Sequence, residues 1–269
     1  ISKLTALKGF NTTIFNILKE KGININKFKE LASTVINEKD LKKSKMDYGL
    51  VTVKFKKLKP IYLDKDSILP GKLLDSIIAS CSLPIFKLEP IIDDNIYIDG
   101  GFYDNCPTVI LAKKNYDLVY EIRINGVGRN RKLKYPKTKV ITINPSRNLC
   151  NILELNQSNI TDNILMGYYD TLRILKNYDG YKYVFRHVSD YFINLITRNL
   201  NEKKIYKLIF YFKAKTKKEA IIKAVEYILE KENISYYAVY SFYAKIREIK
   251  QLKNKANFIY NYVKELSIV

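Results

Sequence analysis

An aspartate followed by two glycines, Asp99-Gly100-Gly101, is the feature of this chain with the clearest chemical potential. The apolar residues 96–98 predict a strand, so the carboxylate stands where a strand ends and the chain must bend. Because glycine has no Cβ, another segment of backbone can approach this bend closely. A carboxylate there, partly buried against apolar neighbours, would have a raised pKa and could act as a general base.

The triplet alone is also typical of an ordinary tight turn. The surrounding sequence must therefore show whether Asp99 has a chemical role. Upstream, Ala79-Ser80 is followed by Pro84 at the end of a predicted helix. Downstream, Asn105 and Pro107 precede another predicted helix. A later segment in a predicted helix reads Gly-Tyr-Tyr-Asp-Thr at positions 167–171.

These segments, in this order, resemble the patatin-like phospholipase family over about residues 47–176. That family carries Ala-Ser-x-x-x-Pro before Tyr-x-Asp-Gly-Gly-x-x-x-Asn-x-Pro. The resemblance implies hydrolysis of lipid acyl esters, of the phospholipase A or esterase type, by a Ser–Asp dyad. Asp99 would be the general base for the serine, and Gly100 and Gly101 would support it. It implies a lipid or acyl-ester substrate, without a cofactor or a metal.

The chain departs from the family pattern at the nucleophile. None of its ten glycines is followed two positions later by serine, so Gly-x-Ser-x-Gly is absent. We expect this motif and the glycine-rich oxyanion loop upstream of Ile1, and we expect residues 1–269 alone to be inactive. The alternative is a catalytically inactive relative that acts as a scaffold for a lipid surface or a partner. Ser80 and Ser82 lack the strand-to-helix elbow of a nucleophile and are expected to line the helix end.

Hydrophobic periodicity places these motifs on an α/β framework. Helices are predicted within residues 4–44 and over 71–80, 108–114 and 160–176, and strands over 48–55, 61–63, 96–98, 117–124 and 138–143. We expect a patatin-like three-layer fold with a mostly parallel central sheet whose N-terminal strands are missing. The phospholipase domain would occupy residues 1–190. An all-helical C-terminal extension would follow at 191–269, with a capping box at 216–219.

Composition excludes several other functions. The 47 basic and 27 acidic residues give a net charge of +20. However, 39 of the basic residues are lysines, as A/T-rich codons would produce, and arginine, the residue suited to base edges, is scarce. We therefore expect no nucleic-acid partner, although contact with an anionic membrane fits the charge. Because the chain has a single histidine, His187, a His-rich metal site is excluded. This histidine is expected to have a structural role or to lie on the surface.

Two further expectations concern location and a glycine-containing loop. Three cysteines form no paired framework, which indicates a reducing, cytoplasmic compartment, with peripheral membrane contact as an option. The start at Ile1 leaves a secretory signal upstream open. Gly126 and Gly128 begin like a dinucleotide-binding loop, but Arg131 replaces the third glycine, so a basic surface loop is expected.

Overall fold

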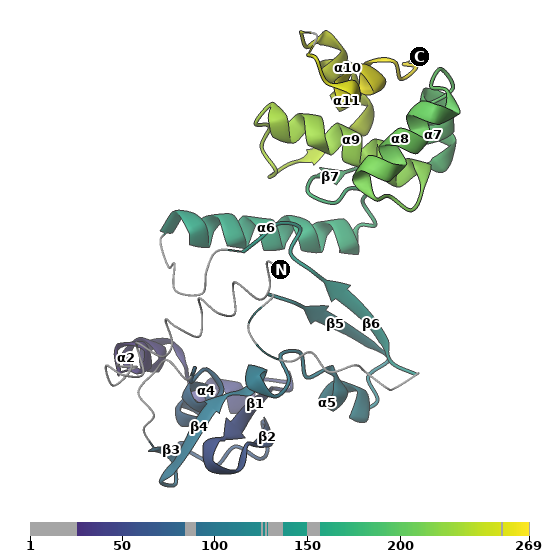
Figure 1. The fold of residues 1–269 in the computed structure, drawn as a ribbon. Coiled ribbons are helices and arrows are strands. Elements are labelled where there is room, and N and C mark those ends of the chain that lie inside the picture. Colours follow the sequence, from purple (N-terminus) through teal and green to yellow (C-terminus); the bar gives the residue numbers. More distant parts are fainter. Residues whose placement is uncertain are drawn as a thin grey trace. The chain divides into compact units, whose positions relative to one another are not determined.

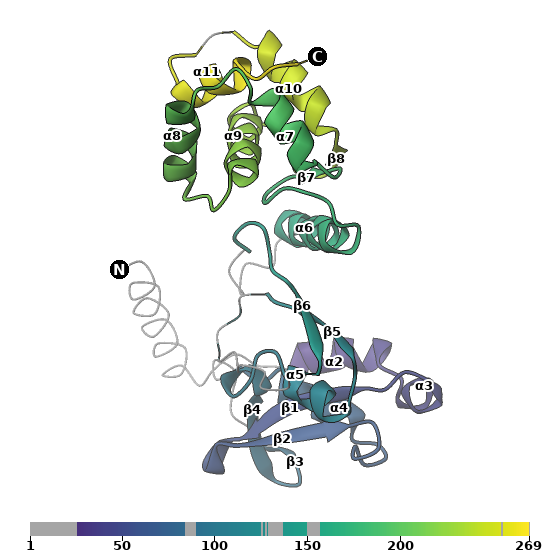
Figure 2. The same cartoon turned by 90° about the vertical axis from the view of Figure 1, so that its right-hand side faces the viewer.

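The computed structural model describes residues 26–83, 90–124, 126, 128, 137–149, 157–253 and 255–268. The chain divides into two compact units. The sheet unit contains Ile1–Glu121 and Gly126–Ile141, and the helical unit contains Ile122–Asn125 and Thr142–Val269. Figures 1 and 2 show the elements of each unit. Of the helical region expected over residues 4–44, residues 4–25 lie outside the described residues.

The sheet unit has the helices and strands that the periodicity predicts, with one added strand. Its helices are α2 (Asn26–Val35), α3 (Glu38–Lys43), α4 (Leu73–Ser80) and α5 (Thr108–Lys113). Its strands are β1 (Gly49–Lys54), β2 (Lys59–Asp64), β3 (Pro90–Ile92) and β4 (Asn95–Asp99), with 3-10 turns η1 (Phe55–Lys57) and η2 (Gly100–Phe102). Two further strands, β5 (Leu118–Ile122) and β6 (Lys139–Ile143), lie where the division between the units falls.

The four-stranded sheet of this unit is antiparallel, contrary to the expectation of a mostly parallel sheet. Its order is β2-β1-β4-β3, and each neighbouring pair is antiparallel. Short connections account for the pairs β1–β2 and β3–β4, because a parallel pair needs a crossover of about a dozen residues. The central pair β1–β4 is antiparallel although residues 55–94 separate its strands. Asp93 and Asp94, both with positive φ, form the two-residue link from β3 to β4. Two such residues are typical of a tight hairpin turn.

Strands β5 and β6 do fit the parallel expectation. They form a separate two-stranded sheet. The Lys139 N–H donates to the Asp117 carbonyl (2.8 Å), and the Arg123 N–H donates to the Ile143 carbonyl (2.9 Å). From the first bond to the second, the residue number increases in both strands. The two strands therefore run in the same direction, as Figure 1 shows.

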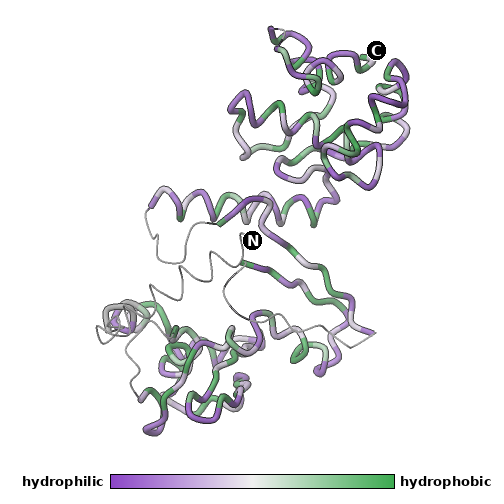
Figure 3. The backbone as a smooth tube through the Cα atoms, viewed as in Figure 1, coloured by the Kyte–Doolittle hydropathy of each residue, from purple (hydrophilic) through white to green (hydrophobic). Residues whose placement is uncertain are grey.

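Helix α4 covers one face of the antiparallel sheet. Its Leu73, Ile78 and Ala79 are buried, as are Val51 and Val53 of β1. Figure 3 shows hydrophobic residues interspersed with hydrophilic ones in this part of the chain. Within this apolar layer, the buried Thr52 hydroxyl lies within hydrogen-bonding distance of two carbonyls, Ala79 O (3.0 Å) and Ile98 O (3.1 Å). This side chain therefore ties the end of α4 to both central strands.

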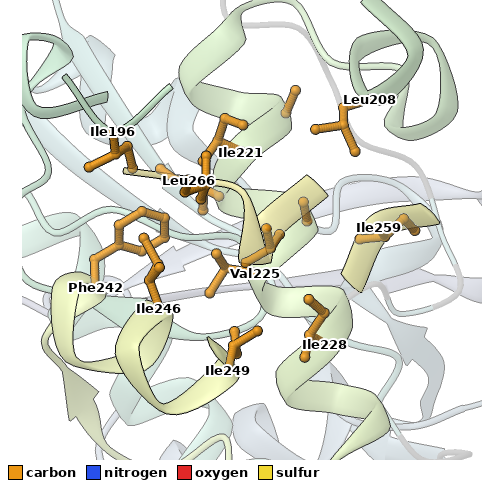
Figure 4. Packing of buried hydrophobic residues seen from close by; sticks show 14 of the residues in the cluster. Ile196, Leu208, Ile221, Val225, Ile228, Phe242, Ile246, Ile249, Ile259 and Leu266 are labelled. Atoms are coloured by element: carbon orange, nitrogen blue, oxygen red, sulfur yellow. The ribbon is translucent and has the colours of Figure 1, made fainter. Parts of the chain in front are cut away.

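The helical unit packs around α9. Its elements are α6 (Gln157–Leu175), β7 (Val184–Phe185), α7 (Asp190–Ile196), α8 (Glu202–Phe212), α9 (Lys217–Lys231), β8 (Val239–Tyr240), α10 (Phe242–Gln251) and α11 (Phe258–Lys264). Figure 4 shows Val225 and Ile228 of α9 facing side chains of α10, among them Ile246 and Ile249. The predicted cap is confirmed, because the Thr216 hydroxyl oxygen accepts the Glu219 N–H at 3.1 Å.

Residues 191–269 are not all-helical, because β8 pairs in parallel with β7. Each of these strands has only two residues, which is too short to give a recognisable strand pattern in the sequence. Tyr183 and Phe185, which precede residue 190, belong to the same buried cluster as α9. The boundary between the two compact units therefore lies within residues 121–142. The predicted domain boundary between residues 190 and 191 remains a prediction. Among the described helices, none is long and apolar enough to cross a membrane.

Candidate functional site

The Asp99 carboxylate is held at the point where β4 becomes the η2 turn. In the sheet register Asp99 is opposite Thr52 of β1. Its N–H donates to the Ser82 carbonyl at 2.7 Å, which fixes the backbone against the end of α4. Its Oδ1 accepts the Gly101 N–H at 2.6 Å, which fixes the side chain. The carboxylate is thus oriented by the turn that follows it.

The two glycines are required because of space, as the sequence predicted. A Cβ at Gly100 would lie 2.1 Å from the Val51 carbonyl oxygen, where no side chain fits. A Cβ at Gly101 would lie 2.3 Å from Asn105 Oδ1 and 3.0 Å from Asp99 Oδ1. Neither glycine has a positive φ. Their role is to let β1 and the Asn105 side chain approach the bend.

Asn105 joins the bend to a segment that the sequence interpretation had set aside. Its Nδ2 donates to the Gly126 carbonyl at 3.1 Å. A Cβ at Gly128 would lie 2.1 Å from the Gly101 carbonyl oxygen and 2.7 Å from Asn105 Nδ2. The beginning of this loop therefore packs against the Asp-Gly-Gly bend, which corrects its interpretation as only a basic surface loop. Residues 129–136 lie outside the described part of the chain. The sequence interpretation noted the two glycines of this loop, but it did not connect them with the bend at Asp99.

The Asp99 carboxyl has the electrostatics of a usable base. Partial burial raises its pKa above the ordinary aspartate value, and the Gly101 N–H bond opposes this in part. Among the described residues, no basic side chain pairs with this carboxylate within 4.0 Å. Burial, followed by the charge of Asp99, raises the pKa of the nearby Cys81 thiol. A thiol in that environment is a poor source of thiolate.

The neighbouring serines have structural roles, in agreement with the expectation for them. The Ser80 hydroxyl donates to the Val51 carbonyl at 2.8 Å. The Ser82 hydroxyl donates to the Ile78 carbonyl at 2.7 Å. Both hydroxyl hydrogens are used on backbone carbonyls, one in β1 and one in α4, so neither serine is presented to Asp99 as a nucleophile.

Two other residues singled out by the sequence also have structural positions. His187 is exposed, and its Nδ1 lies 3.3 Å from Asp179 Oδ2. Asp170 is buried in α6, where it accepts the Ser146 N–H (2.8 Å) and pairs with Arg173 (3.0 Å). The Gly-Tyr-Tyr-Asp segment therefore anchors α6 to the backbone that follows β6, within the helical unit.

One pocket among the described residues of the sheet unit does not include Asp99. It has a volume of about 300 Å³ and lies at the start of β1, beside β2 and α5. Its lining residues are Met46, Asp47, Tyr48, Gly49, Tyr62, Leu63, Asp64, Ile110, Leu111, Lys114 and Tyr116. Lys114 pairs there with Asp47 at 2.7 Å and lies 3.7 Å from Asp64. This salt bridge occupies the charged groups of the pocket lining.

Comparison with known proteins gives one family. The model described as patatin-like phospholipase matches residues 5–112. This range includes Asp99, both glycines and Asn105, and it begins earlier than the motif resemblance over 47–176. The segment at 167–171 lies beyond the match. A search of curated proteins found no match to the chain.

Proposed function

From the premise that residues 5–112 belong to the patatin-like phospholipase family, we propose that the intact protein hydrolyses lipid acyl esters with a Ser–Asp dyad. Asp99 is the general base of this dyad. The serine lies outside these residues, on a Gly-x-Ser-x-Gly turn N-terminal to them, because no such motif occurs within them. The substrate is a phospholipid or a related acyl ester, and the reaction needs no cofactor.

The observation that carries this proposal is a partly buried carboxylate with a raised pKa and no ion pair among the described residues. Oδ1 of Asp99 is occupied by the Gly101 N–H, so Oδ2 is the oxygen available to a serine hydroxyl. The serine proton passes to Asp99 as the serine oxygen attacks the ester carbonyl carbon. The protonated carboxyl then returns this proton to the departing alcohol oxygen. A water molecule then gives a proton to Asp99 and attacks the carbonyl carbon of the acyl-serine. The proton passes from Asp99 to the serine oxygen, which releases the fatty acid and the free serine.

The fold proposed for the intact protein follows from the same premise. The parallel pair β5 and β6 belongs to the central sheet of a three-layer patatin-like domain, which missing N-terminal strands complete. That domain extends to about residue 190, and residues 191–269 are appended to it. The protein acts in the cytoplasm, in peripheral contact with its lipid substrate.

A second candidate function is an inactive scaffold. The absence of Gly-x-Ser-x-Gly from all 269 residues favours it. In that case the Asp99 bend is retained for its structural contacts with β1 and α4, and the chain binds a lipid surface or a partner. The coding sequence upstream of Ile1 separates the two candidates. A serine elbow there supports the enzyme, and a nearby start codon without one supports the scaffold.

The enzymatic test compares the full-length protein with its Asp99→Asn variant on a chromogenic short-chain ester. Loss of a general base lowers kcat by about 10²–10⁴-fold. Asp94→Asn is the matched control, because Asp94 is exposed, lies in the β3–β4 turn and has a positive φ that asparagine tolerates. Equal activity of Asp99→Asn and Asp94→Asn would remove Asp99 from the mechanism. Residues 1–269 alone should show no activity.

A further inference from the structure

The outward face of α8 exposes aromatic side chains and lysines together. Phe210 is 87% exposed and Tyr206 is 66% exposed. Lys203 and Lys207 are exposed beside them. Positions 203, 206, 207 and 210 follow the spacing i, i+3, i+4, i+7, so these four side chains share one side of the helix. They are called the α8 face below.

The opposite side of α8 fixes this orientation. Leu208 is fully buried, and Ile209 and Phe212 pack against the core cluster of the helical unit. At the N-terminus, the Asn201 side chain accepts the Lys204 N–H at 3.0 Å. Figure 2 shows α8 beside α9 within this unit. Rotation of α8 to bury Phe210 would expose Leu208, so the α8 face stays in solvent unless a partner covers it.

The chain around this face is strongly basic. Residues 198–218 contain eight basic residues and one acidic residue, Glu202. Lys204 and Lys218 are paired with acidic side chains within the helical unit. Lys203 forms no ion pair with any described residue. The ammonium of Lys207 lies 4.3 Å from the centre of the Phe258 ring, a contact that leaves its positive charge uncompensated. The α8 face is therefore positive as well as apolar.

We propose that the α8 face docks on the anionic surface of a phospholipid bilayer. Phe210 and Tyr206 enter the headgroup region, where aromatic rings are favoured, and the lysines contact acidic headgroups. A second copy of the chain fits less well, because a symmetric contact would bring Lys203 and Lys207 against their own counterparts. This inference depends on α8 and not on Asp99, so it holds for an active enzyme and for a scaffold.

The experiment measures binding of the purified protein to vesicles by flotation. One vesicle type contains phosphatidylserine and phosphatidylcholine in equal parts, and the other contains phosphatidylcholine alone. We expect tight binding to the first type, weakened by salt. Phe210→Ser should weaken it about tenfold, since part of the benefit of burying a phenyl ring is lost. The double variant Lys203→Gln, Lys207→Gln should weaken it roughly 25-fold, because each lysine near the surface contributes about a fivefold effect.

The controls change the same chemistry elsewhere. Tyr191→Ser removes an aromatic side chain of α7 that is 77% exposed. The double variant Lys56→Gln, Lys57→Gln removes two exposed charges from the sheet unit. Both should bind as the parent does. The proposal is overturned if the parent ignores anionic vesicles, or if Phe210→Ser and the α8 lysine variant bind as tightly as these controls. It is also overturned if Phe210→Ser converts a dimer to a monomer, because a second copy would then cover the face.

Discussion

Replacing Gly100 by alanine tests the central geometry of the site. The new Cβ would have 2.1 Å to the Val51 carbonyl oxygen, and an ordinary contact of 3.4 Å needs about 1.3 Å more. The obstacle is backbone of β1, which cannot rotate away as a side chain could. The η2 turn and β1 must therefore separate, next to the pairing of Thr52 with Asp99.

The expected cost is about 1–3 kcal/mol of unfolding free energy, as for other overpacked sites. Alanine also lowers the conformational entropy of the unfolded chain, which stabilises the folded state by about 0.4–1 kcal/mol. A net loss of about 1–2 kcal/mol is therefore expected. A displacement of about 1 Å can reduce a rate about 100-fold. Ester hydrolysis by the full-length protein should therefore be slowed even under conditions where the variant is still folded.

Urea unfolding followed by circular dichroism measures the free energy of unfolding. Gly49→Ala, in the strand β1 that Gly100 approaches, is the matched control. A Cβ at Gly49 would lie 3.4 Å from the Leu63 carbonyl oxygen, which is ordinary contact, so the change should be within about 0.5 kcal/mol. If Gly100→Ala is as stable and as active as Gly49→Ala, the close approach of β1 to the bend is refuted.

Three further predictions concern polar groups. Burial raises the pKa of Asp99 in the folded state, so its contribution to stability is fully present below the unfolded pKa and is lost as pH rises through the folded pKa. Asp99→Asn should remove this dependence in pH-dependent unfolding, and the acid limb of kcat/KM should lie above pH ~3.9, the ordinary aspartate value. A parent whose acid limb matches ordinary aspartate would contradict the raised pKa. Glu226 is buried in α9 and accepts three backbone N–H groups, from residues 181, 182 and 183, at 2.6, 2.9 and 3.0 Å. Glu226→Ala removes the acceptor of all three N–H groups, of which the Tyr183 N–H is buried, and should cost about 3 kcal/mol or more. Glu248→Ala, which removes an exposed partner of Lys245, should cost less than about 1 kcal/mol. Equal losses in urea unfolding would refute the role of Glu226. Asn105→Asp replaces the donor to the Gly126 carbonyl by a carboxylate oxygen, so hydrogen exchange of the described loop residues should accelerate, and unchanged exchange would show that this bond does not hold the loop.

The local patterns in the sequence predicted most individual elements. The strand before Asp99, the helix that ends at Ser80 and the cap at Thr216 were all readable, because apolar spacing and capping residues act within a few positions. The hairpin at residues 93–94 was missed although its two aspartates are a turn signal, because β3 has only three residues. The two-residue strands β7 and β8 were missed for the same reason of length.

By itself, the sequence determined the position of the carboxylate on a strand end and the need for two residues without side chains after it. Only the tertiary structure decided which atoms fill the space beside them. The Val51 carbonyl faces Gly100, and Gly128 faces Gly101, from segments distant along the chain. It also decided that β1 pairs antiparallel with β4, and that the outward face of α8 is left uncovered within its unit. Such contacts depend on the packing of whole elements, so residue spacing along a single chain does not encode them in readable form.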